Sequence, residues 1–192
     1  MNNFCLYLLF FFIGLTNKFD AQRSVIYKNL EEAIQNKEHV YKLNLSRKKL
    51  DSLPNNLFLL KNLEYLDLSK NRLDHIPKEL KALQNLEHIN LSKNNFTDFP
   101  EIVTELRLLQ EMIINNNKIT SIPKQIKNLN SLIKLDMWSN ELSEIPDEIG
   151  LLTSLKEVDF RVIQFSDREK KRISALLPNA KIYFSNSCNC GD

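Results

Sequence analysis

Apolar residues recur along this chain with a period of 23 residues. With Leu63 as position 1, apolar side chains fall at positions 1, 4, 6, 11, 14, 18 and 21: Leu63, Leu66, Leu68, Leu73, Ile76, Leu80 and Leu83. All seven positions are also apolar in the units that begin at Val40, Leu86, Leu109 and Leu132, and the first four are apolar in the unit that begins at Leu155. Residues 40–165 therefore form six units, of which the last is incomplete.

The spacing within one unit predicts its local structure. Positions 4 and 6 alternate with polar residues, which is the pattern of a short strand with one buried face. Positions 14, 18 and 21 are three and four residues apart, which indicates a helical or 3₁₀ turn. A single unit cannot bury its apolar face alone, but stacked units share one continuous core.

The stretch LEYLDLSKNRL, residues 63–73, resembles the leucine-rich repeat, whose pattern is L-x-x-L-x-L-x-x-N-x-L. Prolines at position 15 (Pro54, Pro77, Pro100, Pro123 and Pro146) are similar to those of the 23-residue subtype of bacterial proteins and Ras-pathway scaffolds. The resemblance implies an α/β solenoid in a horseshoe arc. Its concave face is a parallel sheet, its convex face carries short helical or 3₁₀ segments, and helices cap both ends.

Position 9 holds an asparagine in the four interior units: Asn71, Asn94, Asn117 and Asn140. In the leucine-rich repeat family this side chain points inward and bonds backbone groups of its own and neighbouring turns. Leaving a buried backbone group unpaired costs about 1–3 kcal/mol, so these residues are predicted to be structural. The terminal units carry Lys48 and Ile163 instead, as suits units with a neighbour on one side only.

The flanks of the repeats resemble the caps of small secreted bacterial leucine-rich repeat proteins. Residues 22–39 contain NLEEAI, in which Asn29 and Glu32 have the spacing of a capping box at the start of a helix. Residues 166–192 contain a second apolar helical pattern that opens with Ser166 and Glu169, then the strand-like KIYF and a tail.

The N-terminus carries a 12-residue apolar run, Phe4 to Leu15. A membrane-spanning helix needs about 20 residues, so the run fits a secretory signal peptide over residues 1–21. The protein is then secreted or held at the cell surface or in the periplasm, with no stable membrane insertion after cleavage. An uncleaved membrane anchor or a buried N-terminal strand, and with it a cytoplasmic location, are the alternatives.

Composition and motifs argue against catalysis. The net charge is only +2, which gives no electrostatic reason to expect nucleic acid as a partner. The three histidines are scattered over the repeat, and no motif for a nucleophile, a phosphate loop or a zinc protease is present. Cys188 and Cys190 lie in the tail without a second ligand cluster, which makes zinc improbable. The sequence thus predicts no catalytic residue, metal or cofactor.

What remains is a surface. Positions 3, 5, 7 and 8 of each unit are predicted to be strand positions that face the concave side, where Ile113 and Trp138 stand among polar residues. Trp138 either contacts a partner or folds against its neighbours. The function predicted is an exported binding module for a protein or a glycan, and the alternative is an intracellular scaffold of the Ras-pathway type. The candidate partner-binding residues are Tyr65, His88, Ile113, Asn115, Asp136, Trp138 and Arg161, and a basic strip, Arg47, Lys70 and Lys93, is the second candidate.

Overall fold

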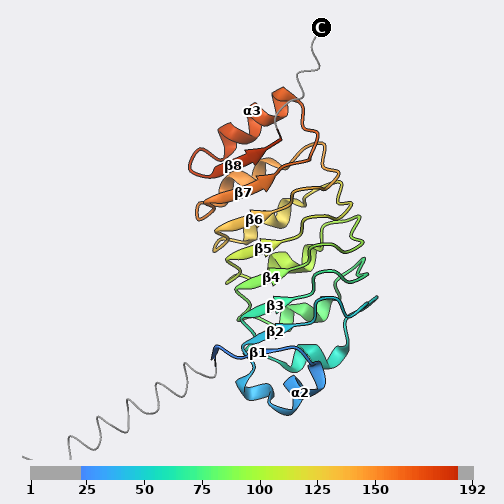
Figure 1. The fold of residues 1–192 in the computed structure, drawn as a ribbon. Helices are drawn as coiled ribbons and strands as arrows, with labels where there is room; N and C mark the ends of the chain where they lie inside the picture. The colour runs from blue at the N-terminus through green and yellow to red at the C-terminus, as the bar shows by residue number, and fades with distance from the viewer. Residues whose placement is uncertain (1–22, 186–192) are drawn as a thin grey trace, which may run out of the picture.

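The structure is a computed structural model that describes residues 23–185. It is a solenoid in which eight parallel strands form one sheet, and the order of the strands in the sheet equals their order along the chain (Figure 1). The strands are β1 (Ile26–Tyr27), β2 (Lys42–Asn44), β3 (Tyr65–Asp67), β4 (His88–Asn90), β5 (Glu111–Ile113), β6 (Lys134–Asp136), β7 (Glu157–Phe160) and β8 (Lys181–Phe184). The solenoid that the 23-residue period predicts is confirmed.

Short 3₁₀ helices lie opposite the sheet (Figure 1). After η1 (Lys37–His39), one follows each of five prolines: η2 (Asn55–Leu59), η3 (Lys78–Ala82), η4 (Glu101–Glu105), η5 (Lys124–Asn128) and η6 (Asp147–Leu151). Each proline is the N-cap residue of its 3₁₀ helix, where its lack of an N–H group removes no hydrogen bond from the helix. Pro77, for example, has an extended backbone with φ −70° and ψ 154°. The predicted convex helical segments are therefore confirmed.

The strands pair in register, so equivalent positions of neighbouring units lie side by side. Leu66 of β3, for example, is the partner of Leu43 on one side and of Ile89 on the other. Each row of the sheet therefore contains one position of the repeat, read across the units. The sequence did not predict β1, which extends this sheet by pairing Ile26 with Lys42.

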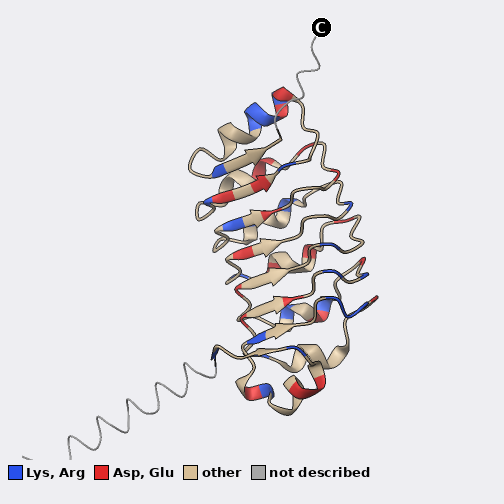
Figure 2. Ribbon diagram, viewed as in Figure 1, with Lys and Arg blue, Asp and Glu red and all other residues tan. Residues whose placement is uncertain are grey.

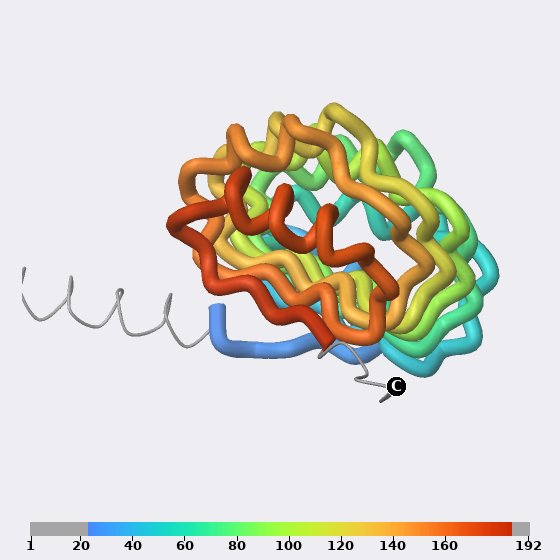
Figure 3. The backbone as a smooth tube through the Cα atoms, turned by 90° about the horizontal axis from the view of Figure 1, so that it is seen from above, coloured from blue at the N-terminus to red at the C-terminus, as the bar shows by residue number. Residues whose placement is uncertain are grey.

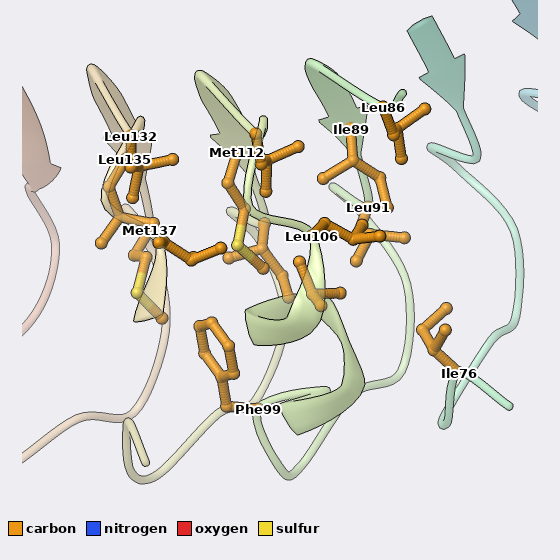
Figure 4. Close-up of a cluster of buried hydrophobic side chains, with 14 of the residues drawn as sticks. Ile76, Leu86, Ile89, Leu91, Phe99, Leu106, Met112, Leu132, Leu135 and Met137 are labelled. Atoms are coloured by element: carbon orange, nitrogen blue, oxygen red, sulfur yellow. The ribbon is translucent and has the colours of Figure 1, made fainter. Parts of the chain in front are cut away.

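One apolar core runs through the whole coil. Figure 4 shows Ile89, Met112 and Leu135, from three successive strands, directed into the same interior that receives Phe99 from the opposite side. Ile89 is 2% exposed and the other two strand residues are fully buried. Because each unit contributes the same positions, the core is continuous across unit boundaries.

A helix lies at each end of the stack. Helix α2 (Leu30–Gln35) begins at Asn29, whose side chain accepts hydrogen bonds from two backbone N–H groups of the first turn. Helix α3 (Asp167–Leu176) begins at Ser166, whose hydroxyl accepts from the N–H of Glu169. Figure 3 shows α3 lying across the open end of the coil, and its Ile173 is fully buried there.

One expectation about the strands is wrong. Position 8, with Arg47, Lys70 and Lys93, does not continue the strand, because β2, β3 and β4 end at position 5. These three residues adopt a left-handed backbone with φ of 59°, 58° and 56° in the turn that follows. The predicted signal peptide and the two tail cysteines lie outside the described residues.

Candidate functional site

The asparagines of position 9 link consecutive turns. The Asn117 side-chain amide donates to the carbonyl oxygens of Leu91 and Ile114 at 3.1 and 3.0 Å. Its oxygen accepts from the backbone N–H groups of Asn94 and Phe96, both at 3.2 Å. Asn71, Asn94 and Asn140 repeat this arrangement, each bonding its own turn and the preceding one. These side chains are therefore part of the scaffold beneath the concave face.

The terminal units depart from this pattern. The Lys48 side chain is exposed, although its backbone N–H still donates to Asn71 at 2.9 Å. Ile163 is 2% exposed and packs in the core. Beside it, the N–H of Val162 donates to the hydroxyl of Ser185 from the segment after β8. A hydroxyl thus takes the place that a backbone carbonyl has in the other units.

Position 3 forms a row of charges that largely neutralise one another. His88 Nδ1 lies 3.2 Å from Glu111 Oε2, and Lys134 Nζ lies 3.4 Å from Glu111 and 3.6 Å from Glu157. Figure 2 shows the resulting alternation of acidic and basic segments from β5 to β8. Next to His88 in this row, on the side of the N-terminal units, the ring of Tyr65 stands 6.4 Å from the His88 ring, and burial raises the pKa of Tyr65. Exposed pairs contribute only about 0–1 kcal/mol, so the row sets surface charge more than stability.

Position 5 is the last strand residue in β2 to β6. In five of the six units its side chain accepts a hydrogen bond from the backbone N–H of position 7, at 2.8 to 3.3 Å. Asn and Asp favour this turn, because the oxygen of their short side chain can accept a hydrogen bond from the backbone N–H two residues further on. The pairs are Asn44–Ser46, Asp67–Ser69, Asn90–Ser92, Asp136–Trp138 and Asp159–Arg161. The recurrence of Asn or Asp at position 5 is the sequence signal that predicts this turn.

Many of these polar side chains are buried against one another. Asp67 is 8% exposed, Ser69 5%, Ser92 7% and Asp159 6%. The variable positions of the repeat therefore do not all face water. Over the N-terminal strands, position 7 carries small residues and the position 5 side chains are engaged in hydrogen bonds. Few side chains at these two positions are therefore free to contact a partner there.

Ile113 interrupts this polar row and changes its surroundings. It is half-buried, and the neighbouring Asn115 is only 7% exposed. The Asn115 amide donates to Asp136 Oδ2 at 2.8 Å, and its oxygen accepts from Asn116 at 2.8 Å. The Asn115 amide thus helps to position Asp136, and both polar groups of the Asn115 side chain are engaged within the protein. Burial raises the pKa of Asp136, and no ion pair to Asp136 exists within residues 23–185.

Trp138 and Arg161 complete this part of the face. Trp138 is half-buried, and its backbone N–H donates to Asp136 Oδ1 at 3.3 Å. Arg161 donates two hydrogen bonds to Asp159, from Nε to Oδ1 at 3.0 Å and from Nη2 to Oδ2 at 2.6 Å. Its guanidinium lies 5.7 Å from the centre of the Tyr183 ring. Its side chain remains 58% exposed. The structure therefore brings Ile113, Asn115, Asp136, Trp138 and Arg161 together at the C-terminal half, and Tyr65 and His88 in the other half.

The described part of the chain offers little for other chemistry. Within residues 23–185 no group of three or more His, Cys, Asp or Glu side chains is arranged to hold a metal ion. Over the same range no helix has both the length and the apolar character needed to cross a bilayer.

Comparison with known proteins agrees with this geometry. The family profile described as "Leucine-rich repeat region" matches residues 39–180, and the chain belongs to this family. Members are commonly protein-interaction modules and are generally not enzymes. No curated protein sequence matches the chain.

Solved structures of several leucine-rich repeat proteins share the fold. A leucine-rich repeat protein of Leptospira interrogans is 31% identical with a TM-score of 0.65, and the match covers 84% of this chain and 48% of that one. Internalin C2 of Listeria monocytogenes is 24% identical with a TM-score of 0.65, over 77% of this chain and 62% of that one. The ectodomain of the Arabidopsis thaliana receptor kinase GASSHO1/SCHENGEN3, solved with CASPARIAN STRIP INTEGRITY FACTOR 2, is 29% identical with a TM-score of 0.62, over 76% and 18%. The chain thus spans about half the length of the Leptospira protein.

Proposed function

We propose that this protein is a non-enzymatic binding module, exported from a bacterial cell, that recognises a protein through the C-terminal half of its concave face. The observation that carries the proposal is the placement of Ile113, in β5, and Trp138, just after β6, beside Asp136, a carboxylate that forms no ion pair within residues 23–185. Aromatic anchors with polar neighbours dominate the energetics of protein interfaces.

The size and the rigidity of the face support a protein partner. Strands stack about 4.8 Å apart, so six repeat strands offer a strip of about 24 Å, which is the scale of a standard interface. Asp136 is held by two hydrogen bonds and carries no ion pair in the described part, so a cationic or N–H group of the partner would complete it. A glycan, which also uses an aromatic ring and acidic groups, is the second ligand class to test.

The family offers a precedent for this use. The plant receptor ectodomain with the same fold was solved in complex with CASPARIAN STRIP INTEGRITY FACTOR 2, so such a repeat array holds a protein partner. A pull-down with the mature protein as bait is the direct way to identify the partner of the present chain.

Substitution of Trp138 tests the site. Once a partner is identified, Trp138→Ala should leave the circular dichroism spectrum unchanged and weaken binding by at least about 2 kcal/mol, or about 30-fold. Lys127→Ala, on the exposed side of η5, is the matched control and should change neither. Unfolding of the Trp138 variant would assign Trp138 to packing. Normal folding with normal binding would move the site elsewhere, with Arg47, Lys70 and Lys93 as the next surface to test.

Export has its own test. The 12-residue apolar run followed by the polar TNKFDAQ supports cleavage between Thr16 and Gln22. Intact-mass measurement of the native protein should give a mature chain that begins in this range. Retention of Met1 on membrane-extracted protein would contradict cleavage, and Met1 retained in the cytosolic fraction would favour the intracellular scaffold.

A further inference from the structure

A hollow of about 580 Å³ lies on the flank of the coil, where the strands begin. Its lining residues occupy positions 22, 23 and 2 of four consecutive units: Glu87, Leu108, Gln110, Ser131, Ile133, Thr153, Ser154 and Lys156. Trp138 follows the other end of its strand, at position 7. The hollow is therefore separate from the proposed partner site.

The repeat itself provides the comparison that marks this hollow as unusual. At position 23 the amides of Asn62 and Asn85 donate to the backbone carbonyls of Glu38 and Lys61, both at 2.9 Å. The next unit replaces this hydrogen-bonding asparagine with Leu108, which is 49% exposed.

Position 2 changes character at the same place. It holds Tyr41, Glu64, Glu87, Gln110 and Lys156 in five units, but Ile133 in the remaining one, where it is 43% exposed. The two apolar departures come from different positions of the repeat, yet the fold brings them into one hollow. Burying such a pair against another apolar surface releases about 25 cal/mol per Å².

Residues of opposite charge lie at the two ends of this apolar pair, so that two copies of the patch in antiparallel orientation would match each acid with a base. Along the stack position 2 reads Glu87, Gln110, Ile133 and Lys156, with an acid at one end and a base at the other. Neither Glu87 nor Lys156 forms an ion pair within residues 23–185, whereas Arg23 on the same flank pairs with Glu64. A two-fold axis between the Gln110 and Ile133 units would place Glu87 of each copy opposite Lys156 of the other.

We propose that this flank is a self-association surface on which two copies of the chain pack antiparallel. Leu108 and Ile133 of each copy cover those of the other, and two Glu87–Lys156 pairs close the ends. A two-fold contact requires one patch that complements itself, and the order of these residues meets that requirement. Eight lining residues are fewer than the 20–30 a side of a stable interface, so the dimer is weak and depends on concentration.

Analytical ultracentrifugation over a series of protein concentrations tests the proposal. The weight-average mass of the wild type should rise towards that of a dimer. Leu108→Asn installs the side chain that other units carry at this position, so it should preserve the fold and weaken dimerisation at least tenfold. Leu151→Asn, at a leucine that is 59% exposed on η6, is the matched control and should leave the dimer intact.

The two charges allow a sharper test. Glu87→Lys and Lys156→Glu should each weaken dimerisation, and the double variant should restore it, because only opposite charges across the two-fold axis are required. Trp138→Ala should leave dimerisation unchanged. A wild type that is monomeric at every concentration, a dimer unaffected by Leu108→Asn, or a double variant no better than the single ones would each overturn the proposal.

Discussion

Replacement of Asn117 by alanine is the most direct probe of what holds the coil together. Asn117 is 8% exposed, and within residues 23–185 its side-chain oxygen is the one acceptor for the N–H groups of Asn94 and Phe96. The carbonyl of Leu91 would keep a second donor, the amide of Asn94 at 3.0 Å. The carbonyl of Ile114 would keep the amide of Asn140 at 3.1 Å. The change therefore leaves two buried donors unpaired, and no acceptor.

Each unpaired buried group costs about 1–3 kcal/mol. Two such groups would cost about 2–6 kcal/mol, and entry of a water molecule into the space of the missing amide offsets part of this. We expect Asn117→Ala to reduce the free energy of unfolding by about 2–4 kcal/mol. At an m value of about 2 kcal/mol/M, the urea midpoint falls by about 1–2 M.

Urea melts followed by far-ultraviolet circular dichroism and by fluorescence of Trp138, the single tryptophan, would measure this change. Coincident transitions would establish that the unfolding is cooperative. Lys48→Ala, at the equivalent position of the first unit, is the control. Its side chain is exposed and its backbone bond to Asn71 survives, so the expected change is below about 0.5 kcal/mol. Equal shifts in both variants would refute the argument that the asparagines stabilise the turns.

Three further substitutions test the C-terminal end. The hydrogen bond from Arg172 lowers the pKa of Glu169 from its ordinary value of 4.5, so the stability that this carboxylate contributes is present above that value and lost as the pH falls through the lower folded-state pKa. Glu169→Gln should therefore lower the urea midpoint at pH 7, and this effect should shrink progressively as the pH is lowered below 4.5. Val162 is β-branched with φ 65°, so Val162→Asn should raise stability by about 1 kcal/mol in the same melts. A Cβ on Gly150 would stand 3.2 Å from the carbonyl oxygen of Leu176. Gly150→Val should therefore reduce the free energy of unfolding by about 1–3 kcal/mol, measured as a lower melting temperature.

The repeat pattern was sufficient to predict the architecture. A period of 23 residues with seven apolar positions predicts stacked units that share a core, and the resemblance to the leucine-rich repeat implies the parallel sheet and the convex helical turns. The helix starts at Asn29 and Ser166 and the final strand over KIYF were also predicted, because caps and short alternating strands depend on neighbouring residues.

Other features depended on contacts that a single unit does not contain. The sequence placed position 8 in the strand, but the side chains of position 5 bond the N–H groups of position 7 and end the strand earlier. Burial of Asn115 follows from its bond to Asp136 of the next unit. Strand β1 was missed because two residues carry too little alternation to be recognised, although the open edge of β2 accommodates them.

The surfaces show the same division. The sequence by itself determined that Ile113 and Trp138 would stand on the concave side, because every residue at one position of the repeat falls in one row. Only the tertiary structure decided which polar neighbours remain free, since hydrogen bonds and ion pairs within and between the rows engage most of them. It also brought Leu108 and Ile133 together, since they occupy different positions of the repeat and meet only when the turns before neighbouring strands are stacked side by side.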